Sequence, residues 1–144
     1  MGDRFHGVFP LFLIGLAIGM GIYFVIIDSR LVGLLYCALI SISLNIVIYS
    51  YCCKCKGRNS CAHVIPAKIA EIFPERKQGK YTSLDYLGLV LSIVILIGFP
   101  QYWLFHNIVF LLFFWVLIII AVVEILYKVC PKCENRECGI CKSR

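Results

Sequence analysis

Four long blocks of apolar residues constrain the fold of this chain more than any other feature. They cover residues 8–27, 31–51, 84–105 and 107–129 and hold very few charged side chains. Blocks of about 18 or more apolar residues with few charges are typical of membrane-spanning helices. At about 1.5 Å of rise per residue, such blocks can cross a hydrocarbon layer of roughly 30 Å. The sequence therefore predicts a single all-α membrane domain with four transmembrane helices.

The overall composition agrees with a membrane protein rather than a soluble one. Charged residues make up 15% of the chain and hydrophobic residues 61%, whereas a soluble domain carries about a quarter charged residues. The first block follows a start that is barely basic, and no small-x-small cleavage site follows it. We therefore expect the first block to be a retained helix and not a cleaved signal peptide.

The positions of the basic residues predict the orientation of the helices. Every Lys and Arg except Arg30 lies near the amino terminus, in the segment 52–83, or in the segment 128–144. With four crossings these three segments share one side of the membrane, and Lys and Arg resist translocation, so that side should be the cytoplasm. The two outer connections are short, which favours antiparallel neighbours. We expect a multi-pass, antiparallel four-helix bundle with both termini cytoplasmic.

Small and polar residues inside the blocks indicate where helices approach one another. Gly15 and Gly19 form a Gly-x-x-x-Gly pattern in the first block, and Gly88 and Ser92 repeat this spacing in the third. Small residues at this spacing let helices pack closely in lipid, either within one chain or in a homo-oligomer. Asn45 should face another helix, because an unpaired amide in lipid is costly.

Three charged residues lie within the blocks, and Pro100 interrupts the third block. Asp85 begins the third block, where an acid suits a helix N-terminus. Pro100 either ends that helix at Phe99 or only kinks it. Glu124 lies deeper in the fourth block with Lys128 four residues later, a spacing that favours an ion pair. The alternative for Glu124 is a carboxylate that handles protons.

The connection between the second and third blocks, residues 52–83, has two parts. The first is rich in cysteine, and the second is bracketed by Pro66 and Pro74. In the second part the apolar residues Ile65, Ile69, Ile72 and Phe73 fall on one side of a helix, with Lys68, Glu71 and Glu75 towards the other. We expect a short amphipathic helix at about 66–73 that rests on the inner leaflet. The alternative is an irregular linker.

The tail, residues 130–144, contains two C-x-x-C motifs separated by four residues. A C-x-x-C turn presents two thiolates to one metal ion, and a tetrahedral structural site needs four ligands. The gap between the motifs is shorter than the roughly 15–20 residues of common zinc spacings. This short gap counts against a site made by the tail alone.

The predicted topology places the loop cysteines on the same side as the tail cysteines. They could form a second site, or a loop pair could share one ion with a tail pair. Cytoplasmic thiols are kept reduced, which favours metal over disulfides; redox activity and acylation near the membrane are further alternatives. We expect zinc, with iron or an iron–sulfur cluster as the alternative. The candidate ligands are Cys52, Cys53, Cys55, Cys61, His63, Cys130, Cys133, Cys138 and Cys141.

The sequence favours a function without catalysis, because it contains no recognisable set of catalytic residues. We expect a cytoplasmic cysteine-rich cap that binds structural metal and serves interaction or assembly. Its partners would be the lipid bilayer and either further copies of the chain or another membrane protein. Nucleic-acid binding is not expected, since membrane orientation already explains the positive charge. The alternatives are electron transfer or thiol redox chemistry through the same cysteines, and transport or sensing of a soft metal ion.

Overall fold

The fold is all-helical in this computed structural model, which describes residues 2–55, 64–74, 76 and 81–132. Four helical segments are long and apolar enough to cross a membrane, as predicted. These segments are Gly7–Asp28, Arg30–Lys54, Ser83–Leu104 and Ile108–Val129.

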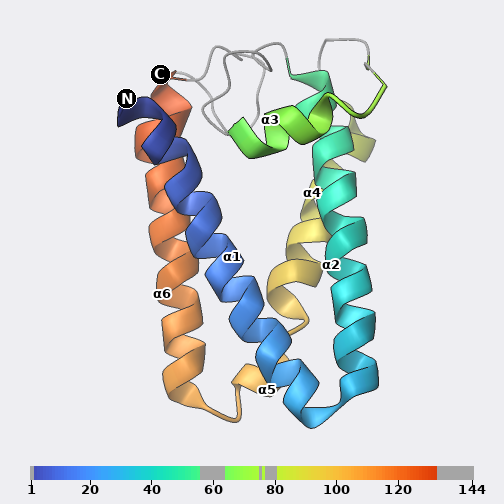
Figure 1. The fold of residues 1–144 in the computed structure, drawn as a ribbon, viewed down its shortest axis with the longest axis vertical. Coiled ribbons are helices and arrows are strands. Elements are labelled where there is room, and N and C mark those ends of the chain that lie inside the picture. Colours follow the sequence, from blue (N-terminus) through green and yellow to red (C-terminus); the bar gives the residue numbers. More distant parts are fainter. Residues whose placement is uncertain (1, 56–63, 75, 77–80, 133–144) are drawn as a thin grey trace.

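The helical elements follow one another with short connections. The start of α1, the end of α2, the short helix α3 and the end of α6 all lie at one end of the molecule, which we call the cap end (Figure 1). The α-helices are α1 (Gly2–Asp28), α2 (Arg30–Ser50), α3 (Val64–Ala70), α4 (Ser83–Ile93), α5 (Gln101–Leu104) and α6 (Ile108–Glu124). The 3₁₀ turns are η1 (Cys52–Lys54) and η5 (Cys130–Lys132), and the π-helical turns are η3 (Val94–Gly98) and η4 (Ile125–Val129).

The main contacts arrange the four long helices as a row in the order α6, α1, α2 and α4. One apolar cluster joins α1 to α6 through Ala17 and Phe114. A second joins α1 to α2 through Val25 and Tyr36. Helices α1 and α2 therefore form the middle of the row, with α6 and α4 at its two ends.

The two small-x-x-x-small patterns have different surroundings. A Cβ atom on Gly88 would lie 3.1 Å from Cγ2 of Ile46 on α2, so Gly88 allows α4 to pack closely there. Ser92, one turn further on, is buried. A Cβ atom on Gly15 or Gly19 would meet nothing within 4 Å in the described part of the chain. The pattern of Gly88 and Ser92 therefore packs within the chain, and the pattern of Gly15 and Gly19 faces outward.

Pro100 kinks the third membrane-length helix without ending it. Proline has no backbone N–H, so the carbonyl of Leu96, four residues earlier, loses its usual helical donor. The hydroxyl of Tyr36 on α2 donates to this carbonyl at 2.9 Å. The π-helical turn η3 precedes the proline, and Gln101 continues the helix as α5. The Leu96 carbonyl thus receives its donor from another helix, and the membrane-length segment continues to Leu104.

Gly21 on α1 provides the space into which Pro100 fits. A Cβ atom at position 21 would lie 2.9 Å from Cβ of Pro100 and 3.2 Å from its Cγ. Such distances are shorter than an ordinary contact between carbon atoms. The close approach of α1 to the kink therefore requires glycine at this position.

Two expected contacts of polar residues do not form within the described part of the chain. Asn45 is exposed on α2 and donates from Nδ2 to the Ser41 carbonyl of its own helix at 2.7 Å. The ion pairs formed among the described residues do not include Glu124 with Lys128. The π-helical turn η4 begins directly after Glu124.

Candidate functional site

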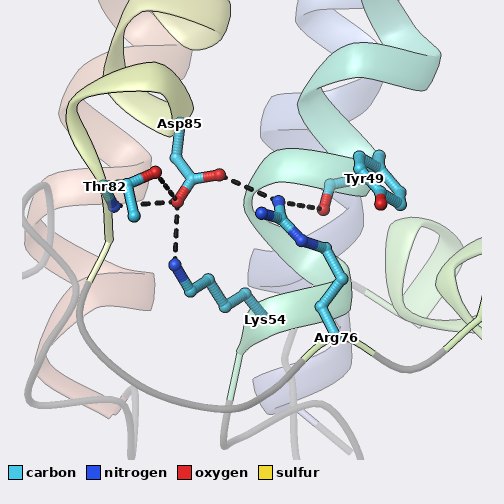
Figure 2. A network of polar contacts seen from close by, with 5 residues as sticks. All are labelled: Tyr49, Lys54, Arg76, Thr82 and Asp85. Atoms are coloured by element: carbon cyan, nitrogen blue, oxygen red, sulfur yellow. Dashed lines mark hydrogen bonds and ion pairs between the residues drawn. The ribbon is translucent and has the colours of Figure 1, made fainter.

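The most polar cluster in the described residues lies at the cap end, around the carboxylate of Asp85. Lys54 Nζ contacts Asp85 Oδ2 at 2.9 Å, and Arg76 Nη1 contacts Asp85 Oδ1 at 2.8 Å. The Asp85 side chain is only 3% exposed and that of Lys54 only 9%. Figure 2 shows the two cations on separate sides of the carboxylate. Burial of these charges is tolerated because they are paired.

Asp85 also caps the helix on which it lies. The Thr82 backbone N–H and the Thr82 hydroxyl each donate to Asp85 Oδ2 at 2.8 Å (Figure 2). In the first turn of α4, the carboxylate thus satisfies the N–H of the residue that precedes the helix. One side chain therefore joins the end of α2, the segment around Arg76 and the start of α4.

Aromatic rings surround this network. Arg76 lies 4.8 Å from the ring centroid of Tyr49, and Lys54 lies 5.8 Å from that of Tyr81. Tyr51 stacks on Tyr81 with 4.7 Å between centroids, and Tyr86 packs against both rings edge-on. Cations over aromatic faces add stability where water is partly excluded. The rings thus help to hold both basic side chains near Asp85.

The cysteines at the end of α2 form a single tight turn. The backbone N–H of Cys55 donates to the carbonyl of Cys52 at 3.2 Å, which closes the 3₁₀ turn η1. Cys52 and Cys55 are partly exposed thiols. Their three-residue separation is that of a C-x-x-C turn, which suits two ligands of one tetrahedral ion.

Cys53, between these two, has different surroundings. It is buried with Ile48 and Ala70, and its Sγ lies 3.8 Å from the Ala70 carbonyl, within donor range for a thiol. A buried cysteine in such a cluster behaves as a small apolar residue with a weak donor. The structure therefore separates Cys53 from Cys52, which sequence spacing alone could not do.

Helix α3 contacts the cap through a narrower face than its sequence suggests. Ala70 is fully buried against Cys53, and Phe73 packs beside it. Ile65, Ile69 and Ile72, which the sequence places on the same apolar side as Phe73, are exposed. These isoleucines are free to contact lipid or a partner.

Cys130 begins the tail at the cap end. It is buried, and it is disulfide-bonded in this structure. Its bond is not with Cys37, Cys52, Cys53 or Cys55, which are all thiols. The remaining candidate ligands lie outside the described residues: Cys61, His63, Cys133, Cys138 and Cys141.

Within the part of the chain that the structure describes, no three His, Cys, Asp or Glu side chains are grouped so as to hold a metal ion. The turns η1 and η5 follow the ends of α2 and α6 at the cap end (Figure 1), and Cys52, Cys55 and Cys130 lie in or directly after these turns.

Sequence reasoning did not find the partners of Asp85. It placed Asp85 at a helix N-terminus, which is correct, but Lys54 and Arg76 lie 31 and 9 residues away in the chain. The available signal was weak: one acid at the membrane end of a loop rich in cations.

Comparison of the chain with protein families, with curated proteins and with solved structures finds no match to any of them.

Proposed function

We propose that this chain is a multi-pass membrane protein whose cap end is cytoplasmic and binds structural zinc through cysteine pairs from the loop and the tail. The bound ion would hold the tail against the loop and give the cap a fixed surface for interaction or assembly. The observation that carries the proposal is the η1 turn, which holds Cys52 and Cys55 together at the end where the tail begins with Cys130.

The number of ligands supports a site shared between loop and tail. A structural zinc site takes four ligands, and the turn supplies two. The tail contains two further C-x-x-C motifs at Cys130 and Cys138, too close together for a common self-contained zinc site. One loop pair with one tail pair completes the set, and a tail pair that includes Cys130 would bind the ion only after its disulfide is reduced. Basic residues in both segments offset the negative charge of four thiolates, and the Asp85 network holds Lys54 next to Cys55.

The proposed orientation rests on the charge distribution and agrees with the position of the cap. Lys54 and Arg76, and also Lys132 at the end of η5, belong to the cap end, whereas Arg30 begins α2 at the opposite end. Since basic residues resist translocation, the cap end faces the cytoplasm. In sealed cells a membrane-impermeant thiol reagent should leave the tail cysteines unlabelled. Labelling of the tail from outside would contradict this orientation.

The metal content of anaerobically purified protein tests the zinc proposal. We expect stoichiometric zinc and no visible colour. Cys52→Ser and Cys55→Ser should each lower the zinc content strongly. Cys37→Ser is the matched control, because Cys37 lies within α2 and should not affect the metal. Protein without metal, or zinc that survives both loop substitutions, would contradict the proposal.

A second candidate function is thiol–disulfide redox chemistry, and the disulfide at Cys130 favours it. A thiolate of a reduced partner protein would attack one sulfur of this bond and release the other as a thiolate, and a second partner thiol would complete the two-electron reduction. The same preparation separates the two functions. Metal-free protein whose Cys130 cycles between disulfide and thiol in a glutathione buffer supports redox chemistry, and stoichiometric zinc with permanently reduced thiols excludes it.

A further inference from the structure

The outer surface of α2 carries a polar stripe in the middle of the membrane-length helix. Ser41 and Asn45 lie well inside Arg30–Lys54 and are both exposed. Among the described residues, each bonds only to its own helix: the Ser41 hydroxyl donates to the Cys37 carbonyl at 3.1 Å, and Asn45 Nδ2 donates to the Ser41 carbonyl at 2.7 Å. The side-chain carbonyl oxygen of Asn45 accepts no hydrogen bond from the described residues. Lipid chains contain no hydrogen-bond donor that could replace one.

The exposed residues around Asn45 recur at the spacing of a helix-pairing surface. Steps of three, four, three and four residues lead from Leu31 to Asn45. Leu31 and Leu34 are 75% and 72% exposed. This alternation is the heptad pattern with which two helices pack along their length. We call this set the outer stripe of α2: Leu31, Leu34, Ala38, Ser41 and Asn45.

We propose that the outer stripe of α2 is a homodimer surface, in which Asn45 of one copy hydrogen-bonds to Asn45 of a second copy. A carboxamide carries both a donor and an acceptor, so two identical side chains satisfy each other across a twofold axis. Two copies inserted with the same topology have Asn45 at the same depth, which makes the pairing automatic. Small side chains at positions 38 and 41 let the two helices approach closely.

The outward-facing Gly15 and Gly19 on α1 are the competing surface. In the part of the chain that the structure describes, nothing within 4 Å would meet a Cβ atom at either position, so both are open to a partner. A pair of small residues offers close packing only, whereas Asn45 has an unmet hydrogen-bonding requirement in lipid. The α2 surface is therefore the one with a specific reason to be covered.

Energy transfer between copies of the full-length chain in liposomes tests the proposal. Donor and acceptor fluorophores are attached to an appended amino-terminal tag, and the protein-to-lipid ratio is varied. Reductant and a chelator are present, so disulfides and shared metal ions cannot link the copies. We expect reversible dimerisation, with Asn45→Leu weakening association by about 3- to 30-fold, the range of one to a few interhelical hydrogen bonds. Asn45→Gln, which keeps donor and acceptor, should associate more strongly than Asn45→Leu.

Three controls make the result decisive. Leu44→Ala removes an exposed side chain off the stripe and should leave association unchanged. Ala38→Ile adds bulk on the stripe and should weaken association. The thermal unfolding of Asn45→Leu should match that of the native chain, because the lost bond lies within one helix. A chain that stays monomeric, Asn45→Leu that dimerises normally, or Gly15→Leu that alone abolishes association would overturn the proposal. None of these outcomes depends on metal content, so the zinc proposal is tested separately.

Discussion

The hydroxyl of Tyr36 donates a hydrogen bond to the carbonyl of Leu96, 60 residues further along the chain, at 2.9 Å. This carbonyl is the one that Pro100 leaves without a helical donor. The Tyr36 ring also stacks on Phe99, with 4.8 Å between centroids and 10° between ring planes. Helix α2 thus supports the kinked helix both by packing and by replacing its missing bond.

Tyr36→Phe keeps the ring and removes only this hydrogen bond. We expect a loss of about 1 kcal/mol in the free energy of unfolding, because the partly buried Leu96 carbonyl is left without a donor. Reversible unfolding in mixed micelles measures the change. The same substitution in a Pro100→Ala background should cost less, since residue 100 then supplies an N–H. An equal cost in both backgrounds would show that the proline does not create the need for Tyr36.

Gly21→Ala should destabilise the protein by about 1–3 kcal/mol, the usual range for overpacking. The added methyl group would lie 2.9 Å from Cβ of Pro100, so α1 or the kink must move. Gly15→Ala and Gly19→Ala are matched controls on the same helix with open space around them. These two should be neutral or stabilising, because alanine favours helix over glycine. Similar unfolding temperatures for all three variants would contradict the close packing at Gly21.

Asp85→Ala should be among the most destabilising substitutions at the cap end. It leaves the buried Lys54 ammonium and the half-buried Arg76 without their acid, at a cost of about 3–5 kcal/mol. Thermal unfolding in detergent measures the effect. Glu71→Ala removes an exposed carboxylate on the same loop and should change stability little.

A double-mutant cycle separates the ion pair from other contributions of Asp85. Asp85→Ala combined with Lys54→Ala should cost less than the sum of the two single substitutions, because neither charge is then buried alone. Strict additivity would mean that the contact between Lys54 and Asp85 does not contribute to stability.

The different surroundings of the loop cysteines predict different effects on metal binding. Cys53→Ser should retain zinc at nearly the native stoichiometry, since the Cys53 thiol faces the Ala70 carbonyl at 3.8 Å. Cys52→Ser should lose zinc. Metal analysis of the two purified variants makes the comparison. A Cys53→Ser protein that loses zinc as completely as Cys52→Ser would contradict the assignment of Cys52 and Cys55 as the ligand pair.

The main features of the helical architecture follow from local properties of the sequence. The length and apolarity of a block decide whether it can form a helix that crosses a membrane, and both are read directly from consecutive residues. Asp85 was recognisable as a residue of a first helical turn for the same reason, since a helix N-terminus favours an acid wherever it occurs. The effect of Pro100 was ambiguous, because it depends on whether a donor from elsewhere reaches Leu96.

The partners of the polar residues required the tertiary structure. The rule that an amide in lipid seeks a partner is sound, but it does not identify the partner, and Asn45 bonds to its own helix and faces outward. The sequence by itself determined four apolar helices and a cysteine-rich segment next to them. Only the tertiary structure placed Tyr36 on Leu96, Gly21 against Pro100, and Lys54 and Arg76 on Asp85. The physical reason is that each of these contacts depends on how separate segments pack together, which no local pattern of residues specifies.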